Sequence, residues 1–414
     1  MKNIAILHYS CPPVVGGVEE IVRQQASLFR RHFYPVKVIA GKGGHFLKDL
    51  HVELNPLLAS DHPEIREVQN APEGDGKTNN LNIFTDRIAS YLREVLFDVD
   101  VLIAHNVLTM PYNLPLTRAL HRLAENDHVR VISWNHDSPY FYDNYPEYLK
   151  DGHWSLLRTY NRHIEYITIS DRRAEQFKEL YGLEHPLPVV PNGIDPIRFF
   201  RLEDTTWRLI KEQDLFSADL VLVQPSRLHP RKNIEKSIEV LAAFKKKNQK
   251  VKLLLTGAFD PHETATYDYY RKLIALAEQL NVLDDLVMVA DYTFKNGHKL
   301  TPDRVTIRDL YLIADILFLP SKQEGFGIPL LEAGMIKLPI ACSDIPPFRA
   351  IAAEDALYFD PDEKAEIISD KIERFLKDLK PQRMFRKVIN RYVWDNIFHH
   401  HLKDLIEKDP VTNH

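Results

Sequence analysis

The chain has 414 residues, more than the roughly 250 to 300 at which a single hydrophobic core stops growing, so two domains are expected. Hydrophobic residues make up 44% and charged residues 27%, which is typical of a soluble globular protein and excludes a disordered chain. The formal net charge of -5 gives no overall attraction to nucleic acid or anionic lipid, and two cysteines are too few for a disulfide framework or a structural zinc site.

Short apolar runs alternate with helical patterns through the first half of the chain. Residues 3–9 (NIAILHY) predict a buried strand, followed by a Pro/Gly loop and a helix over about 18–33. Later runs predict strands at 36–40, 101–105, 129–134 and 166–170. Residues 41–82 carry many turn formers and weak periodicity, so we expect long loops there, at the rim of the first domain.

The second half restarts in the same way. Residues 219–224 (DLVLVQ) predict a strand, and a polar loop (PSRLHPRK) leads into a helix over about 233–246. Further strands are predicted at 251–257, 286–290 and 315–320. Near-continuous apolar strands between helices are typical of parallel sheets, so the sequence predicts an α/β protein of two doubly wound, Rossmann-like domains. The turn formers at 191–195 place the domain boundary near residue 195.

A glycine-rich segment directly follows the strand predicted at 315–320. Gly325 and Gly327 permit a close backbone approach, and Pro329 suits the first position of a helix whose free N–H groups would face an anion. The segment therefore predicts a diphosphate cradle. Glu332, expected in the first helical turn, can accept hydrogen bonds from ribose hydroxyls, and Glu324 can hold sugar hydroxyls. For the glycines alone, an ordinary strand-to-helix turn is the alternative.

This segment resembles the Glu-x7-Glu motif of retaining glycosyltransferases of family four, the group 1 glycosyltransferases that include sucrose-phosphate synthases. The resemblance implies the GT-B fold, in which two Rossmann-like domains face a central cleft. It implies a first domain at 1–195 on the acceptor side, a donor-binding domain at 196–385 and a C-terminal helix at 386–414 that crosses back to the first domain. It also implies that Glu324 is catalytic and that the donor contacts Glu324, Gly325, Phe326, Gly327, Ile328 and Glu332.

The loop at 225–232 carries the second signal. Arg227 and Lys232 lie just before a predicted helix, where two fixed cations can neutralise a diphosphate leaving group. A solvated basic loop is the alternative. Family members have an Arg and a Lys at this spacing, so the resemblance implies catalytic and donor-binding roles for both residues. We expect Arg231 to have no such role.

The first half carries weaker signals. Gly16 and Gly17 follow the first strand and resemble the family's glycines near the donor phosphates, although a structural turn is equally compatible. His136 follows the strand at 129–134, at the sheet edge where α/β proteins bind ligands. The family has a His at the matching strand end, which implies that His136 is catalytic and that Asp137 is a weaker companion.

We expect no metal site. The motif Asp98-Val99-Asp100 matches an Asp-x-Asp metal motif, but it directly precedes a predicted strand and is interpreted as its polar start. The run His399-His400-His401 occupies consecutive helix positions about 100° apart, which cannot converge on one ion.

The sequence and this resemblance together predict a cytoplasmic, metal-independent hexosyltransferase, and the resemblance implies that the reaction is retaining. This enzyme needs no cofactor and uses a nucleotide diphosphate sugar and a small soluble carbohydrate or polyol acceptor, with no nucleic-acid partner and no membrane association. The alternatives are a GT-B-like epimerase or hydrolase of the nucleotide sugar, and a non-catalytic sensor. An oxidoreductase is disfavoured because neither half shows Gly-x-Gly-x-x-Gly. The base, the sugar, the acceptor and the oligomeric state stay open.

Overall fold

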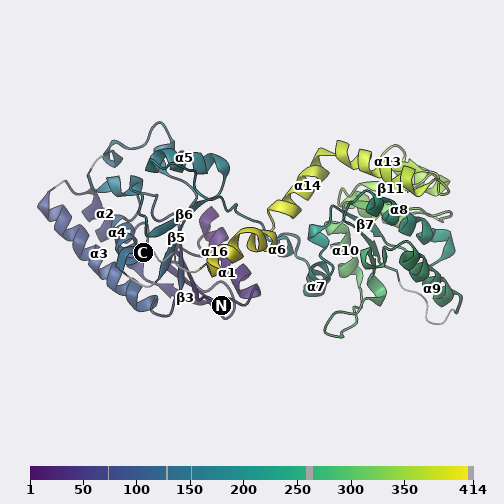
Figure 1. The fold of residues 1–414 in the computed structure, drawn as a ribbon, viewed down its shortest axis with the longest axis horizontal. Helices are drawn as coiled ribbons and strands as arrows, with labels where there is room; N and C mark the ends of the chain where they lie inside the picture. The colour runs from purple at the N-terminus through teal and green to yellow at the C-terminus, as the bar shows by residue number, and fades with distance from the viewer. Residues whose placement is uncertain (73, 127–128, 151, 258–263, 409–414) are drawn as a thin grey trace. The chain divides into compact units, whose positions relative to one another are not determined.

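The computed structural model describes residues 1–72, 74–126, 129–150, 152–257 and 264–408. The chain divides into two compact units, Met1–Ile194 with Tyr392–His414, and Asp195–Arg391. The chain therefore enters the second unit once and returns once. In Figure 1, α16 (Lys403–Glu407) lies among elements of the first unit. The return point follows α14 (Lys380–Arg391), so the boundary expected at residue 385 would fall inside a helix.

The first unit is built on a six-stranded parallel sheet. Its strand order is β3-β2-β1-β4-β5-β6. The strands are β1 (Ile4–Ser10), β2 (Val36–Lys42), β3 (His51–Leu54), β4 (Val101–His105), β5 (Arg130–Asn135) and β6 (Ile164–Thr168). The main helices are α1 (Gly17–Arg31), α2 (Pro63–Asn70), α3 (Asp75–Val95), α4 (Leu114–Asn126) and α5 (Asp171–Tyr181).

The second unit repeats this plan. Its six parallel strands are ordered β12-β11-β10-β7-β8-β9. The strands are β7 (Leu220–Gln224), β8 (Val251–Leu255), β9 (Leu286–Met288), β10 (Ile316–Leu319), β11 (Ile340–Ser343) and β12 (Leu357–Phe359). Besides α14, the helices are α6 (Pro196–Phe200), α7 (Asp204–Glu212), α8 (Ile234–Lys246), α9 (Thr264–Gln279), α10 (Arg304–Ile313), α11 (Ile328–Met335), α12 (Pro346–Ala352) and α13 (Ala365–Asp378).

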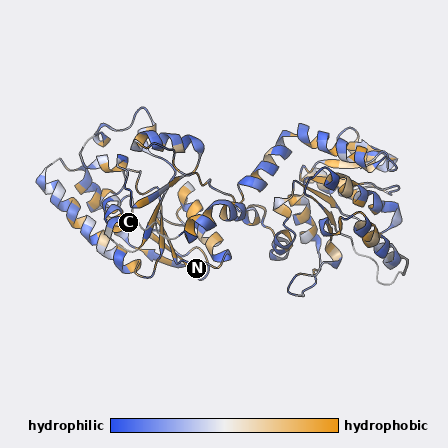
Figure 2. Cartoon of the chain, viewed as in Figure 1, coloured by the Kyte–Doolittle hydropathy of each residue, from blue (hydrophilic) through white to orange (hydrophobic). Residues whose placement is uncertain are grey.

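The prediction of two doubly wound α/β domains is confirmed. Every residue of β1 and β7 is buried, which is why these strands appear in the sequence as unbroken apolar runs. Figure 2 shows mostly hydrophobic strands and helices of mixed character in both units. Each sheet reverses its strand order next to its first strand, between β1 and β4 and between β7 and β10. Loops at the carboxyl edge diverge at such points, which is where open α/β sheets bind ligands.

One local prediction was wrong. Residues 41–82 were expected to form long loops, but they contain β3, α2 and the start of α3. β3 is an edge strand with no buried residue, so its sequence lacks an apolar run. α3 begins with polar residues, and its burial starts mainly further along, at Leu81 and Phe84. Tertiary packing decides the structure of both segments.

The two crossing segments are joined to each other inside the first unit. The backbone N–H of Ile194 donates to the carbonyl of Tyr392 at 2.7 Å, and that of Trp394 donates to the carbonyl of Ile194 at 3.3 Å. A Cβ on Gly193 would lie 2.7 Å from Trp394 Cδ2, so only glycine fits there. Trp394 is fully buried in the core beside α1. Among the described helices, none combines the length and apolar character that a bilayer crossing requires.

Candidate active site

In the second unit, Lys232 and Glu324 form an ion pair at the carboxyl edge of the sheet. Lys232 ends a 3-10 turn (Pro230–Lys232) after β7, and Glu324 follows the neighbouring strand β10. Lys232 Nζ lies 2.5 Å from Glu324 Oε1, and Ser321 Oγ donates to the same oxygen at 2.9 Å. Their side chains are only 15% and 12% exposed. The structure therefore joins two of the predicted site residues in a sheltered pair and adds Ser321.

Arg231 also contacts Glu324, a contact that the sequence did not indicate. Its Nη1 lies 3.4 Å from Glu324 Oε2 and donates to the carbonyl of Gln323. The backbone carbonyl of Arg231 accepts from the N–H of Lys322 at 2.8 Å, which ties the two loops together. The sequence could not show this contact because it depends on β7 and β10 being neighbours.

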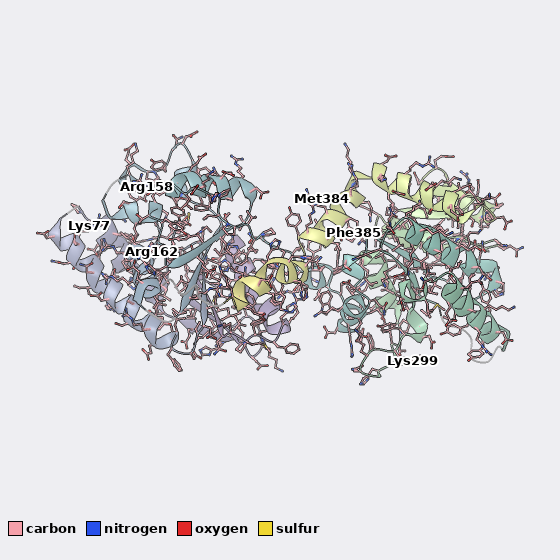
Figure 3. All side chains as sticks on the ribbon, in the orientation of Figure 1. Lys77, Arg158, Arg162, Lys299, Met384 and Phe385 are labelled. Carbon is pink, nitrogen blue, oxygen red and sulfur yellow. The ribbon has the colours of Figure 1, made fainter. Side chains whose placement is uncertain are left out.

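Arg227 lies elsewhere at the same edge. Its side chain is exposed, makes no hydrogen bond or ion pair with any described residue, and lines an open cavity of about 750 Å³. The walls come from the segments after β7 and β8 and from the stretch leading into α10: Pro225, Ser226, Arg227, Thr256, Gly257, Ala290, Lys299, Leu300, Thr301, Pro302, Asp303, Arg304 and Ile307. Lys299 is labelled in Figure 3, on the loop between β9 and α10.

Gly257 is a cavity residue that sequence reasoning missed. A Cβ at this position would overlap the backbone of Ser226 and Arg227, so only glycine lets the loop after β8 approach the loop after β7. The sequence signal that could have identified Gly257 is a Thr-Gly pair directly after an apolar strand.

The glycine-rich segment starts α11 slightly differently from the prediction. The helix begins at Ile328, with Gly327 as its N-cap at φ +128, so Pro329 occupies the second position rather than the first. At Gly327, a Cβ would lie 3.2 Å from Phe348 and Ile351, whereas Gly325 has open space around it. The first N–H groups of an α-helix have no partner within the helix, so the start of α11 offers donors to an anion.

Three further predicted residues lie on or beside α11. Glu332 is in the second turn rather than the first, and its exposed carboxylate accepts a hydrogen bond from the Tyr311 hydroxyl at 2.8 Å. Burial, and then this bond, raise the pKa of Tyr311. Phe326 and Ile328 are 57% and 60% exposed, so both are accessible to a ligand.

In the first unit, His136 directly follows β5 and is held on three sides. Its Nε2 lies 3.1 Å from His105 Nδ1, and Asn192 Nδ2 lies 3.3 Å from its Nδ1. Its backbone N–H donates to Asn106 Oδ1 at 3.0 Å. Burial, and then the proximity of His8, lower the pKa of His136 to about 3, so the ring is neutral at physiological pH.

Asp137 belongs to a separate cluster. It accepts from Arg173 at 2.9 Å and from the Tyr142 hydroxyl at 2.7 Å. Arg173 also lies over the ring of Phe141. These contacts fasten the loop after β5, which carries Phe141 and Tyr142, to α5, so the Asp137 side chain has a structural role there.

Gly16 and Gly17 differ in their surroundings. A Cβ on Gly16 would overlap the Glu19 carboxylate, which also accepts from Ser10 Oγ at 2.5 Å. Gly16 thus makes room for Glu19. Gly17, the first residue of α1, has nothing within 4 Å of a Cβ and leaves the start of this helix open.

Comparison with known proteins adds family evidence to this geometry. The family model described as "Glycosyltransferase Family 4" matches residues 15–198, and the model described as "Glycosyl transferases group 1" matches residues 205–391. The chain belongs to these two glycosyltransferase families. The predicted family is confirmed, and the Glu324–Glu332 segment lies inside the group 1 match.

Several similar proteins carry mannosyl in their names. Mannosylglucosylglycerate synthase of Petrotoga mobilis is 25% identical over 65% of this chain and 65% of that protein, and the synthase of Thermotoga maritima is 24% identical over 63% and 60%. The mannosyltransferase WbdA of Escherichia coli is 46% identical over 14% of this chain and 7% of its own length. The chain spans less than two thirds of the length of these curated relatives.

Solved structures of low identity also match nearly the whole chain. Sucrose-phosphate synthase from Thermosynechococcus elongatus has a TM-score of 0.38 and 15% identity, covering 97% of this chain and 98% of its own. Anabaena Alr3699/HepE, solved in complex with UDP and glucose, has a TM-score of 0.37 and 17% identity, covering 98% and 99%.

The residues that were considered as metal ligands have other surroundings. Asp98 pairs with Lys37 at 2.6 Å, and Asp100 accepts from the backbone N–H of Asn3 at 2.6 Å, both at the start of β4. The side chains of His399, His400 and His401 are exposed in a π-helical turn (Phe398–Leu402). Within the described part of the chain, no three His, Cys, Asp or Glu side chains gather as metal ligands.

Proposed function

We propose that the protein is a retaining glycosyltransferase that moves a hexosyl group from a nucleotide diphosphate sugar to a hydroxyl of a small soluble acceptor. The observation that carries this proposal is the Lys232–Glu324 pair, which lies in the same unit as a cavity lined by Arg227, an arginine with no ion-pair partner among the described residues. Both features occupy the carboxyl edge of the β7–β10 sheet, at its strand-order reversal. Family membership favours glycosyl transfer over epimerisation or hydrolysis.

The nucleotide and its diphosphate occupy the second unit in this proposal. The cavity accommodates the nucleoside, and Arg227 and Arg304 line it without any carboxylate partner among the described residues. The diphosphate lies against Lys232, Arg231 and the open backbone amides at the start of α11. These groups supply the positive charge that a divalent cation provides in metal-dependent enzymes, so we propose that the reaction needs no metal.

The sugar contacts Glu324 and Glu332 in this arrangement. Glu324 Oε1 is occupied by Lys232 and Ser321. Among the described residues, Oε2 has only the longer contact to Arg231, so it can accept from a sugar hydroxyl. Glu332 is exposed and can accept from the ribose. Because several relatives carry mannosyl in their names, a mannosyl group is the first candidate for the transferred sugar.

The chemical step breaks the bond from the anomeric carbon to the diphosphate oxygen and forms a bond to the acceptor oxygen on the same face. The proton of the acceptor hydroxyl passes to the departing diphosphate. Charge develops on that diphosphate in the transition state, and the cations of the β7–α8 loop stabilise it there. The retained configuration is inferred from family likeness.

Ligand-induced stabilisation tests the donor site directly. The free nucleotides UDP, GDP and ADP, and then their sugars, are added to the protein while its melting temperature is followed. A nucleotide present at about 100 times its Kd adds about 2.7 kcal/mol to the free energy of unfolding. We expect one base to stabilise the wild type and Lys322→Ala, and to stabilise Lys232→Ala less. Lys322 is a matched control because its side chain is exposed and, among the residues that the structure describes, pairs only with Asp362 at 3.4 Å.

No stabilisation by any nucleotide, or equal stabilisation of all three proteins, would contradict the proposed donor site.

A further inference from the structure

Three histidines from adjacent strands meet at the carboxyl edge of the first sheet. His8 is on β1, His105 ends β4 and His136 follows β5. His8 Nδ1 donates to the backbone carbonyl of His105 at 2.7 Å. The His105 ring is fully buried and stacks on Trp134, with ring centroids 5.3 Å apart. Such a cluster cannot carry several positive charges.

Both ring nitrogens of His105 and His136 are used in one continuous chain of hydrogen bonds. Gln25 Oε1 lies 2.9 Å from His105 Nε2, His105 Nδ1 lies 3.1 Å from His136 Nε2, and His136 Nδ1 lies 3.3 Å from Asn192 Nδ2. Burial lowers the pKa of both histidines, with His8 as a further cause, so both rings are neutral. The nearby Glu19 carboxylate, in contrast, raises the pKa of His8.

Because both imidazole rings are neutral, the donor-to-acceptor direction of this chain of hydrogen bonds is fixed. A neutral imidazole has one donor and one acceptor nitrogen, so the three bonds must all point the same way. With Gln25 offering its carbonyl, His105 donates from Nε2 and accepts at Nδ1. His136 then donates from Nε2, and its Nδ1 carries a lone pair that faces Asn192.

At its outer end, at Asn192, the chain of hydrogen bonds is incomplete. Within the described residues, Asn192 Oδ1 is buried without a hydrogen-bond partner, and so is Gln25 Nε2 at the inner end. Asn192 is two residues before Ile194, where the chain leaves the first unit. A ligand hydroxyl that donates to His136 Nδ1 and accepts from Asn192 Nδ2 would replace the longest bond of the chain, 3.3 Å, by two bonds.

We propose that His105 is a positioning residue that locks the His136 ring in its Nε2–H tautomer, so that Nδ1 offers a lone pair to a carbohydrate hydroxyl. The role of the hydroxyl rests on the proposed function, whereas the lock on the tautomer does not. Gln25 sets the direction by anchoring His105 to α1, where Gln25 is fully buried.

Nitrogen-15 NMR of histidine-labelled protein tests the lock without any activity measurement. The two-bond proton–nitrogen correlations of a neutral imidazole differ between the Nε2–H and Nδ1–H tautomers. The His136 signal is identified as the one that is lost in His136→Gln. We expect the wild-type His136 to show the Nε2–H pattern and no titration between about pH 5 and 8. In His105→Phe, which keeps an aromatic ring against Trp134, we expect a mixture of tautomers or a titrating His136.

Two variants keep this test decisive. His121→Phe is the control. His121 is another buried histidine of the first unit, but it contacts Asn161 and is not part of the hydrogen-bond chain through His105 and His136. If His105→Phe does not fold, Gln25→Met removes the inner acceptor and is expected to weaken the same tautomer preference. An unchanged His136 pattern in a folded His105→Phe or Gln25→Met protein would overturn the proposal.

Activity then separates this proposal from the proposed function. We expect His105→Phe to lower kcat roughly 10- to 100-fold through a misplaced His136, with the Kd for the free nucleotide unchanged. Equal kcat in the variant and the wild type would overturn the positioning role. If no nucleotide sugar is turned over by the wild type, the proposed function fails while the NMR result for the tautomer still stands.

Discussion

Removing the Lys232 ammonium leaves Glu324 as a sheltered carboxylate. In Lys232→Ala, Ser321 still donates to Glu324 Oε1 at 2.9 Å and Arg231 remains 3.4 Å from Oε2, so the carboxylate keeps two partners. Breaking a buried ion pair outright costs about 3 to 5 kcal/mol. The remaining partners reduce this loss to roughly 1 to 3 kcal/mol. For a unit of this size the melting temperature falls by about 2 to 4 °C per kcal/mol.

The effect on turnover has a different origin. Loss of one charge-stabilising donor from an active site commonly costs at least roughly 10²-fold in kcat, or about 2.7 kcal/mol. The double variant Lys232→Ala/Glu324→Ala separates the two effects, because it removes the unpaired carboxylate. We expect the double variant to be more stable than the sum of the single variants predicts, and its turnover to stay low.

Melting curves and initial rates of nucleotide release on the same preparations measure both quantities. The reasoning fails if Lys232→Ala turns over like the wild type, or if Lys322→Ala is equally impaired. If the stability loss of the double variant equals the sum of the losses of the two single variants, the two side chains do not interact, which would contradict the expected effect on stability.

Arg231→Ala is expected to lower kcat less than Lys232→Ala, because its contact with Glu324 is longer and more exposed, and rate measurements on the three Ala variants of the loop will rank them. Arg227→Ala is expected to raise the Kd for the nucleotide and lower turnover roughly 10²-fold or more; if its titration curve matches the wild type, Arg227 is not a nucleotide contact. Turnover is expected to persist in excess EDTA, and a loss restored by magnesium or manganese would show a metal requirement. With anionic liposomes at physiological salt, we expect the protein to stay in the supernatant; substantial co-sedimentation would contradict a soluble acceptor.

The two-domain α/β fold could be predicted from the sequence because the central strands of each sheet are buried on both faces. The strand predicted at 219–224 is β7 (Leu220–Gln224), and that at 315–320 is β10 (Ile316–Leu319). Polar edge strands such as β3 gave no such signal, and short strands such as β12 (Leu357–Phe359) have too few residues to show a period.

The candidate site was only partly readable. Glu324 and the glycines were found because their order along the chain carries the signal. The contacts of Arg231 with Glu324 and of His105 with His136 join residues 93 and 31 positions apart, and they exist only because of which strands are neighbours. Such pairings follow from sheet order, which a single sequence does not reveal.

Proton NMR of the first product formed from a nucleotide sugar and a hydroxyl acceptor tests the proposed retaining glycosyl transfer. The nucleotide that stabilises the protein selects the donor, and its mannosyl and glucosyl forms are tried with a panel of small sugars, glycerate and glycosides. We expect the wild type, and not Lys232→Ala, to form a new glycosidic bond whose anomeric proton coupling shows the same configuration as the donor. Release of free sugar with every acceptor, or a product of inverted configuration, would contradict the proposal.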